Sequence, residues 1–290
     1  MTQSLRDLVA EELSLPVDPR VSDLASAIAA KHKHASRAVL FYGSCLRQKQ
    51  LDGLMLDFYL IVSDYRSAYD KKWLATANRL VPPNVFYFEH DGLVAKYAVL
   101  SEADFARECG PEARSTSVAA RFAQPSRLVW TANEAARALV VDSISKCAPT
   151  LLGWAAPIAP RAVDILDVWK RAFQLTFGAE LRAERADRSS SIVEADADRY
   201  RRFGEAAGVA IPKLGDGARW WRRMQRKGKL LSVVRLAKAS ATFAGGADYI
   251  AWKGNRHAGT KIELKPWQRR WPLLAGITLL PRLLKSGAVR

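Results

Sequence analysis

The stretch LFYGSCLRQKQLDGLMLDFYLIV, residues 40–62, contains the features that decide the fold of this 290-residue chain. Two apolar runs, 38–42 and 54–62, are rich in the β-branched and aromatic residues that are typical of strands. Between them lies the turn Gly43-Ser44, which directly follows the first run. The pattern therefore predicts two strands that flank a glycine turn.

The turn and an acid on the second strand have the chemistry of a nucleotide site. A glycine lets the backbone approach a triphosphate closely, and the Ser44 hydroxyl with neighbouring N–H groups can bind phosphate oxygens. Asp57, within the second run, can hold Mg²⁺ against the same phosphates. We take Tyr42, Gly43 and Ser44 as candidate nucleotide-binding residues and Asp57 as a candidate catalytic and metal-binding residue. A plain loop with Asp57 at an exposed strand position is the alternative interpretation.

The rest of the chain predicts an α/β (α+β) fold with a mixed sheet. Two further apolar runs are separated by the turn His90-Asp91-Gly92 and are expected to be strands. Apolar residues at three- and four-residue spacing predict helices elsewhere. We expect strands at 84–88 and 93–100, helices at 4–34 (broken near Pro16), 67–79, 102–108 (capped by Ser101), 133–147, 160–186 and 194–207, and loops at 151–160 and 212–217.

The charge of the chain is concentrated near its C-terminus. The whole chain has 45 Lys and Arg against 29 Asp and Glu, a net charge of +16. Residues 219–290 hold 17 of these bases and 2 of the acids, whereas residues 1–218 are nearly neutral. We therefore expect three parts: a sheet domain at 1–130, a helical domain at 131–218 and a basic region at 219–290. Such a basic region favours a polyanion, either nucleic acid or an anionic lipid surface.

The basic region also contains five of the nine tryptophans. Tryptophan beside lysine and arginine is typical of segments that lie at a bilayer interface. The segment 271–284 is too apolar for a free surface and too short to span a membrane. We expect Trp267, Trp271, Leu279 and Leu280 to contact an anionic membrane surface, with nucleic acid as the less favoured partner. A solvated basic face whose tryptophans lie in the core is the alternative interpretation.

Other classes of protein are not supported by the composition. The three cysteines, Cys45, Cys109 and Cys147, are far apart and lack CxxC spacing, so neither a zinc site nor a disulfide framework is expected. No apolar run has the length of a membrane span, and the N-terminal residues carry acids where a signal peptide is apolar. We expect a cytoplasmic protein that is peripheral at the inner face of the membrane.

Several short blocks occur in the same order as in one known family. Together they make residues 37–255 resemble the mitochondrial-type phosphatidate cytidylyltransferases, or CDP-diacylglycerol synthases, which have a nucleotidyltransferase domain. The blocks are Tyr42-Gly43-Ser44, Met55-Leu56-Asp57-Phe58, Val85-Phe86-Tyr87, Asp91-Gly92, KYAVLS at 96–101, ARFAQP at 120–125, LTFGAELR at 175–182 and LLSVVRLAKAS at 230–240.

The resemblance implies a reaction and further site residues. It implies transfer of CMP from CTP to phosphatidate, giving CDP-diacylglycerol and pyrophosphate, with Mg²⁺ as cofactor and residues 1–130 as the nucleotidyltransferase-like domain. Lys96 and Arg121 then join Asp57 as catalytic residues, because cations suit the charge on the phosphates. A surface ion pair for Lys96 and a helix-end charge for Arg121 are the alternatives.

The chain also departs from that family. Cys45 follows Ser44 where the family has a second glycine, which leaves less room beside the phosphates. Tyr59 stands where the general pattern has a second acid. A further metal ligand is therefore expected from Asp64 or Glu180, or from Asp52, or else the site uses one protein carboxylate per metal together with the substrate phosphates. A nucleotidyltransferase that acts on RNA or protein, and a non-catalytic membrane-bound relative, are the alternative functions.

Overall fold

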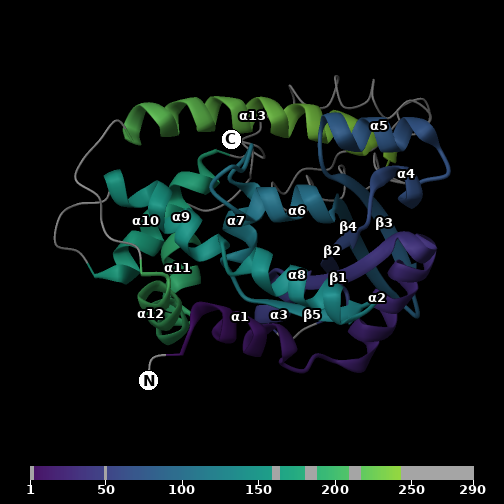
Figure 1. Cartoon of the computed structure of the whole chain (residues 1–290), viewed down its shortest axis with the longest axis horizontal. Helices are drawn as coiled ribbons and strands as arrows, with labels where there is room; N and C mark the ends of the chain where they lie inside the picture. Colours follow the sequence, from purple (N-terminus) through teal and green to yellow (C-terminus); the bar gives the residue numbers. More distant parts are fainter. Residues whose placement is uncertain (1–2, 49–50, 159–163, 180–187, 209–216, 243–290) are drawn as a thin grey trace.

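The computed structural model describes residues 3–48, 51–158, 164–179, 188–208 and 217–242 (Figure 1). A mixed sheet of five strands forms its centre: β1 (Ser36–Tyr42), β2 (Met55–Val62), β3 (Asn84–His90), β4 (Leu93–Ser101) and β5 (Ser126–Thr131). The strand order is β3-β4-β2-β1-β5, and β2 and β4 are parallel whereas the other neighbours are antiparallel. The predicted α/β fold with a mixed sheet is confirmed.

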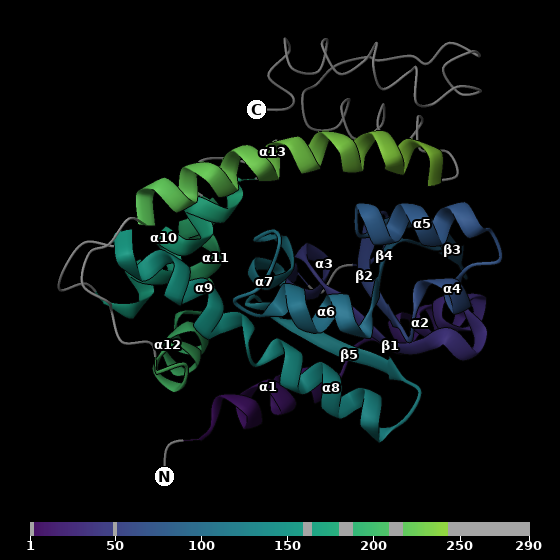
Figure 2. The same cartoon turned by 45° about the horizontal axis from the view of Figure 1, so that its top comes forward.

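Helices cover both faces of the sheet and continue beyond it (Figures 1 and 2). They are α1 (Leu5–Ser14), α2 (Pro19–Lys31), α3 (Ser44–Gln48), α4 (Tyr65–Ala68), α5 (Lys72–Leu80), α6 (Glu102–Cys109), α7 (Ser117–Phe122), α8 (Glu134–Ile144), α9 (Cys147–Ala155), α10 (Ile165–Phe177), α11 (Arg188–Glu194), α12 (Ala197–Ala206) and α13 (Gly217–Thr242).

Many helices begin at a residue whose side chain accepts a hydrogen bond from the first turn. Ser101 accepts from the Asp104 amide at the start of α6, as predicted, and Asn133 accepts from the Ala136 amide at the start of α8. Asp18 does the same for α2, with Pro19 at the first helical position. Each cap satisfies an amide that has no partner inside its helix, so local sequence fixes these helix starts.

Several elements differ from the prediction: α3, α7 and α11 have no predicted counterpart, and α10 ends at Phe177, within the helix predicted at 160–186. The helix predicted at 67–79 is two helices, α4 and α5, because Tyr69 is extended and buried between them. The first part of the loop predicted at 151–160 is helical, because α9 continues to Ala155. Its residues are nearly all apolar and therefore show no amphipathic period. Strand β5 has no predicted counterpart; its sequence, SRLVWT, lacks a clean alternation of apolar and polar residues.

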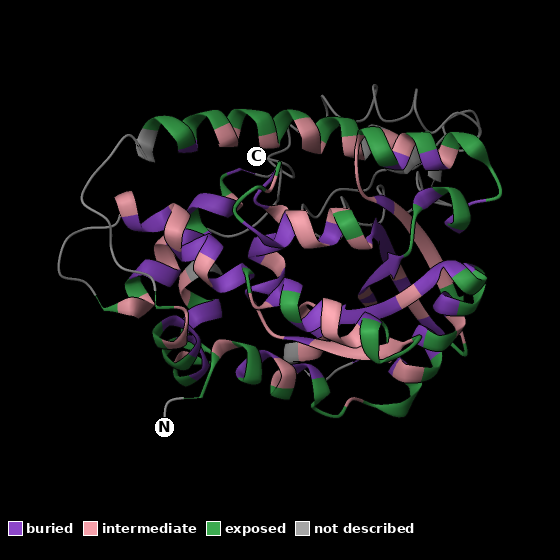
Figure 3. Cartoon of the chain, in the orientation of Figure 1, coloured by how far each residue is buried: buried purple, intermediate pink, exposed green. Residues whose placement is uncertain are grey.

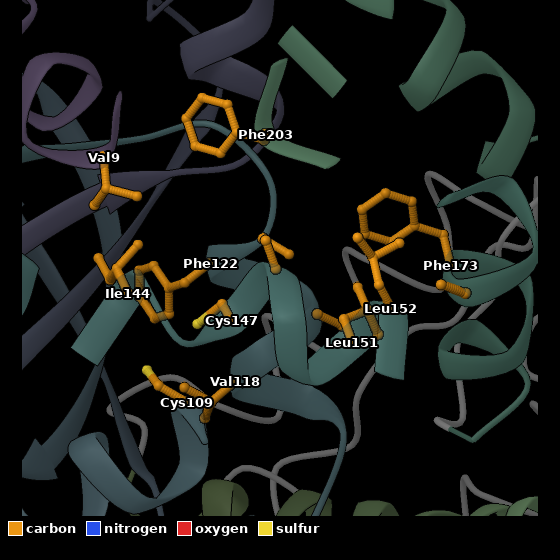
Figure 4. Close-up of a cluster of buried hydrophobic side chains, with 14 of the residues drawn as sticks. Val9, Cys109, Val118, Phe122, Ile144, Cys147, Leu151, Leu152, Phe173 and Phe203 are labelled. Atoms are coloured by element: carbon orange, nitrogen blue, oxygen red, sulfur yellow. The ribbon is translucent and has the colours of Figure 1, made fainter. Parts of the chain in front are cut away.

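The two faces of the sheet have separate hydrophobic cores. In β2, Phe58 and Leu60 pack into the core under α2, α4 and α5, whereas Tyr59 and Ile61 pack into the other core. That second core extends from the sheet through α7 and α8 to α9, α10 and α12, so the helical region shares it (Figure 3). Figure 4 shows its centre, where Phe122 lies among Cys147, Ile144 and Val118. The domain boundaries at 130 and 218 stay a prediction.

A buried ion pair joins the N-terminal helix to the helical region. Arg199 of α12 is 4% exposed and binds Glu12 of α1, with Nη2 donating to Oε1 at 2.9 Å and Nε donating to Oε2. Arg199 Nη1 also donates to the Ala123 carbonyl at 3.1 Å, and the guanidinium lies 4.1 Å from the ring centre of Phe203. Removing either charge would leave the other buried without compensation.

We predict that Glu12→Gln lowers the free energy of unfolding by about 3 kcal/mol, because the Arg199 charge stays buried without a counter-charge. The matched control is Arg6→Gln, which breaks the exposed Arg6–Asp142 pair and should cost less than about 1 kcal/mol. Urea denaturation followed by circular dichroism measures both. Equal losses in the two variants would contradict the structural role of the buried pair.

Candidate functional site

The turn after β1 brings its backbone directly against the carboxylate of Asp57. Gly43 has a φ of +98°, and a Cβ built on it would lie 2.9 Å from Asp57 Oδ2. A side chain at this position would be strained by the backbone conformation and would also collide with the carboxylate. The glycine is therefore required, and the predicted proximity of turn and acid is found in the structure.

The register of the sheet aligns polar residues across all five strands. Asp57 lies opposite Tyr42 on one side and Lys96 on the other, and Lys96 lies opposite Tyr87. Residues opposite one another in a sheet project to the same face. We call the set Tyr87, Lys96, Asp57, Tyr42 and Ser126, from β3, β4, β2, β1 and β5 respectively, the polar row. Tyr87 and Ser126 are not among the predicted site residues, although Tyr87 lies in one of the blocks that carry the family resemblance.

The centre of the polar row is an ion pair. Lys96 Nζ lies 3.0 Å from Asp57 Oδ1, and the two side chains are 29% and 18% exposed respectively. Partial burial lowers the local dielectric, so this pair is stronger than one at a free surface. The pairing joins two of the predicted catalytic residues through the parallel contact of β2 and β4.

Arg121 of α7 lies on the same side of the sheet. Its Nη1 donates to the hydroxyl of Tyr59 at 3.2 Å and to the Ser117 carbonyl at 3.5 Å. Its guanidinium carbon lies 5.3 Å from the ring centre of Tyr42 and 5.8 Å from that of Tyr59, within the range of a cation–π contact. Since Tyr42 neighbours Asp57 in the register, Arg121 is a second cation beside the polar row.

Two of the other carboxylates proposed as metal ligands, Asp64 and Asp52, have partners away from Asp57. Asp64 caps α4, accepting from the Ser67 hydroxyl and from the Ser67 and Arg66 amides, and these bonds lower its pKa. It follows the far end of β2, about 20 Å along the chain from Asp57. Asp52 is exposed and pairs with Arg20 at 3.0 Å. Glu180 lies outside the described residues.

The donors at the site do not match those of a magnesium ion held by the protein. Mg²⁺ prefers carboxylate and other oxygen ligands, and an ammonium group opposes it. Asp57 already forms an ion pair with the Lys96 ammonium group, and the Tyr59 hydroxyl accepts a hydrogen bond from Arg121. In the described part of the chain, no group of three His, Cys, Asp or Glu side chains lies together as a metal site.

Contrary to the expectation from sequence, Cys45 does not reduce the room beside Asp57. Its side chain is buried in the core on the other face of the sheet, and Sγ donates to the Met55 carbonyl at 3.6 Å. Burial, together with the nearby Asp57 carboxylate, raises the pKa of the Cys45 thiol. The Cys45 side chain therefore does not lie on the face that carries Asp57 and Lys96.

Helix α13 is the described part of the basic region. Trp221 is buried and donates its indole N–H to the Trp154 carbonyl at 2.8 Å. At the other end, Arg235 donates to the Pro82 carbonyl and Lys238 to the Pro83 carbonyl, both at 2.8 Å. The helix thus runs from the helical region to the segment between α5 and β3 (Figures 1 and 2).

The membrane prediction is only partly covered by the described residues. Trp221 lies in the core, which agrees with the alternative interpretation of a solvated basic face whose tryptophans are buried. Trp267, Trp271, Leu279 and Leu280 lie outside the described residues. None of the helices described here has both the length and the apolar character to cross a membrane.

Comparisons with known proteins add little to this geometry. No protein-family model and no curated protein matches the chain. Among solved structures, the chain is similar to a nucleotidyltransferase-like protein from Exiguobacterium sibiricum 255-15, with a TM-score of 0.30 and 10% sequence identity, covering 93% of each chain. A TM-score this low carries no argument about activity.

Proposed function

We propose that this chain is a nucleotidyltransferase that transfers CMP from CTP to phosphatidate. The observation that carries the proposal is the Gly43 turn, whose backbone lies against the ion pair of Asp57 and Lys96 with Arg121 alongside. A close backbone turn and two cations suit the binding of a triphosphate. The choice of CTP and phosphatidate rests on the resemblance of the sequence blocks to the phosphatidate cytidylyltransferases.

The reaction requires positioning more than proton transfer. An oxygen of the lipid phosphate attacks the α-phosphorus of CTP, and the bond from that phosphorus to pyrophosphate breaks. The attacking phosphate monoester is already ionised at neutral pH, so it needs no general base. Lys96 and Arg121 offset the negative charge of the triphosphate and of the leaving pyrophosphate. The Gly43 turn and the Ser44 hydroxyl hold the nucleotide in line.

A lipid acceptor requires contact with a membrane, and exposed side chains on α13 support that contact. Its outward residues include six exposed bases, and the described helix carries no acid. These bases suit anionic headgroups. They are Arg219, Arg222, Arg223, Arg226, Lys227 and Lys229.

Apolar side chains are exposed on the same helix and on its neighbour. Of the seven large apolar side chains exposed in the described ranges, six belong to α13 or α5. Arg235 and Lys238 of α13 bind the segment that directly follows α5. Bases together with exposed apolar groups favour an interfacial position, at the inner face of the membrane in the cytoplasm. The six are Trp73, Leu80, Trp220, Leu230, Val233 and Val234.

An acceptor screen tests the proposal. We expect pyrophosphate release from CTP when phosphatidate vesicles are added, and no release with vesicles of phosphatidylcholine alone. ATP, GTP and UTP serve as nucleotide controls in the same assay. Transfer of label from a nucleotide to RNA or protein would instead favour the alternative nucleotidyltransferase. Absence of transfer to every acceptor would favour a non-catalytic relative.

We predict that Gly43→Ala lowers kcat/KM for transfer about 100-fold, because the turn must move away from Asp57. The matched control is Gly153→Ala in α9, where an added Cβ meets no atom within 4 Å and alanine favours the helix. Steady-state kinetics and thermal unfolding are measured for both. Wild-type kinetics in a folded Gly43→Ala protein would remove this turn from the site.

We predict that the double change Leu230→Asp and Val234→Asp lowers partition to phosphatidate-containing vesicles at least about tenfold, since it removes apolar contact and adds acid to a basic helix. Leu15→Asp is the control, because Leu15 is an exposed leucine at the C-cap of α1. Helix α1 lies on the opposite side of the molecule from α13 (Figure 1). Vesicle flotation at low and high salt measures the partition. Equal flotation of the double variant and the wild type would exclude this face of α13.

A further inference from the structure

We infer that this site binds a nucleoside triphosphate without a divalent cation, through Lys96 and Arg121, and that Asp57 is a positioning residue for Lys96. The inference rests on the proposed nucleotide site but goes beyond it. It assigns to two side chains of the chain the neutralising role that the family resemblance gives to Mg²⁺.

The first support is the place of Lys96. It lies on β4 directly opposite Asp57 in a parallel register, so the backbone of two central strands sets the approach of the two groups. Their separation of 3.0 Å is that of a direct ion pair, and both side chains are largely buried. A divalent ion bound to Asp57 would meet the ammonium at close range, where repulsion is poorly screened.

The second support is the pair formed by Tyr59 and Arg121. Tyr59 is two residues beyond Asp57 and projects to the same face of β2. A carboxylate there would supply a metal with a second oxygen, but the residue is a phenol whose hydroxyl accepts a hydrogen bond from Arg121. The same guanidinium packs on the ring of Tyr42. The place where the general pattern has a second acid is therefore occupied by Tyr59 with a cation, Arg121, bound to it.

The charges of these residues favour an anion over a cation. Lys96 and Arg121 together outweigh Asp57 by one positive charge, whereas two carboxylates in the same places would repel phosphate. The Asp57 carboxylate then holds the flexible lysine side chain at the level of the Gly43 turn. Phosphate oxygens placed over the turn would meet two fixed cations without a bridging metal.

The decisive experiment measures binding of CTP to the full chain by isothermal titration calorimetry, in EDTA and in excess MgCl₂. We expect dissociation constants that agree within about threefold. Lys96→Met should weaken binding at least about tenfold in both buffers, because it removes a charged hydrogen-bond donor. The control Lys31→Met alters a lysine of α2 that lies 4.8 Å from the ring centre of Phe88, on the other face of the sheet, and should leave binding unchanged.

Asp57→Asn separates a positioning residue from a metal ligand. We expect this variant to bind CTP at least as tightly as the wild type both in EDTA and in excess MgCl₂, since a negative charge beside the phosphates is lost. Its kcat for transfer should fall at least about tenfold, because Lys96 is no longer held in place. A metal ligand would instead lose affinity when Mg²⁺ is present and show no change in EDTA.

The outcomes separate failure of this inference from failure of the proposed function on which it rests. Binding of CTP by the wild type in magnesium but not in EDTA would overturn the inference and leave the nucleotide site in place. A folded Lys96→Met protein with wild-type affinity in both buffers would also overturn it. Binding in neither buffer would overturn both the inference and the proposed function. The wild-type comparison needs no variant, so it does not depend on how well any substitution folds.

Discussion

The close approach of the Gly43 backbone to the Asp57 carboxylate is the constraint on which the site depends. It requires a residue without a side chain at a positive φ, and it requires β1 and β2 to pair so that Tyr42 lies opposite Asp57. A shift of one residue in that register would turn Asp57 toward the core under α2 and destroy the site. The hydrophobic cores on both faces prevent the shift, because Phe58 and Tyr59 would exchange environments.

The site is also a product of strand order. Lys96 reaches Asp57 because β4 lies beside β2, although β3 comes between them in the sequence. The parallel pairing needs a crossover, and α4, α5 and β3 provide it. Because β4 then lies beside β2, Lys96 in β4 is placed opposite Asp57 in β2. The chemistry of the site therefore depends on how distant segments pair, and the local motif supplies only half of it.

The sequence predicts the parts that local chemistry controls. The strands around Gly43 and the cap Ser101 follow from residue type and spacing. The predicted loop that proves to be α9 lacks the required pattern, because a buried helix is apolar all round. The side-chain directions of Cys45 and Asp64 depend on packing and capping that no spacing rule contains. The polar row emerges only from the register.

The long-range contacts of α12 and α13 have a consequence for folding during synthesis. Glu12 and Arg199 are 187 residues apart, and Arg235 is 153 residues from Pro82. At about 5–20 residues per second, α1 leaves the ribosome roughly 10–40 seconds before its arginine partner. The strands of the sheet are complete once Thr131 has been made. Helix α1 and the segment before β3, however, gain these contacts only after α12 and α13 have been synthesised. Contacts of this kind between distant segments raise the contact order, and the apolar surfaces that they cover stay exposed until α12 and α13 have been made.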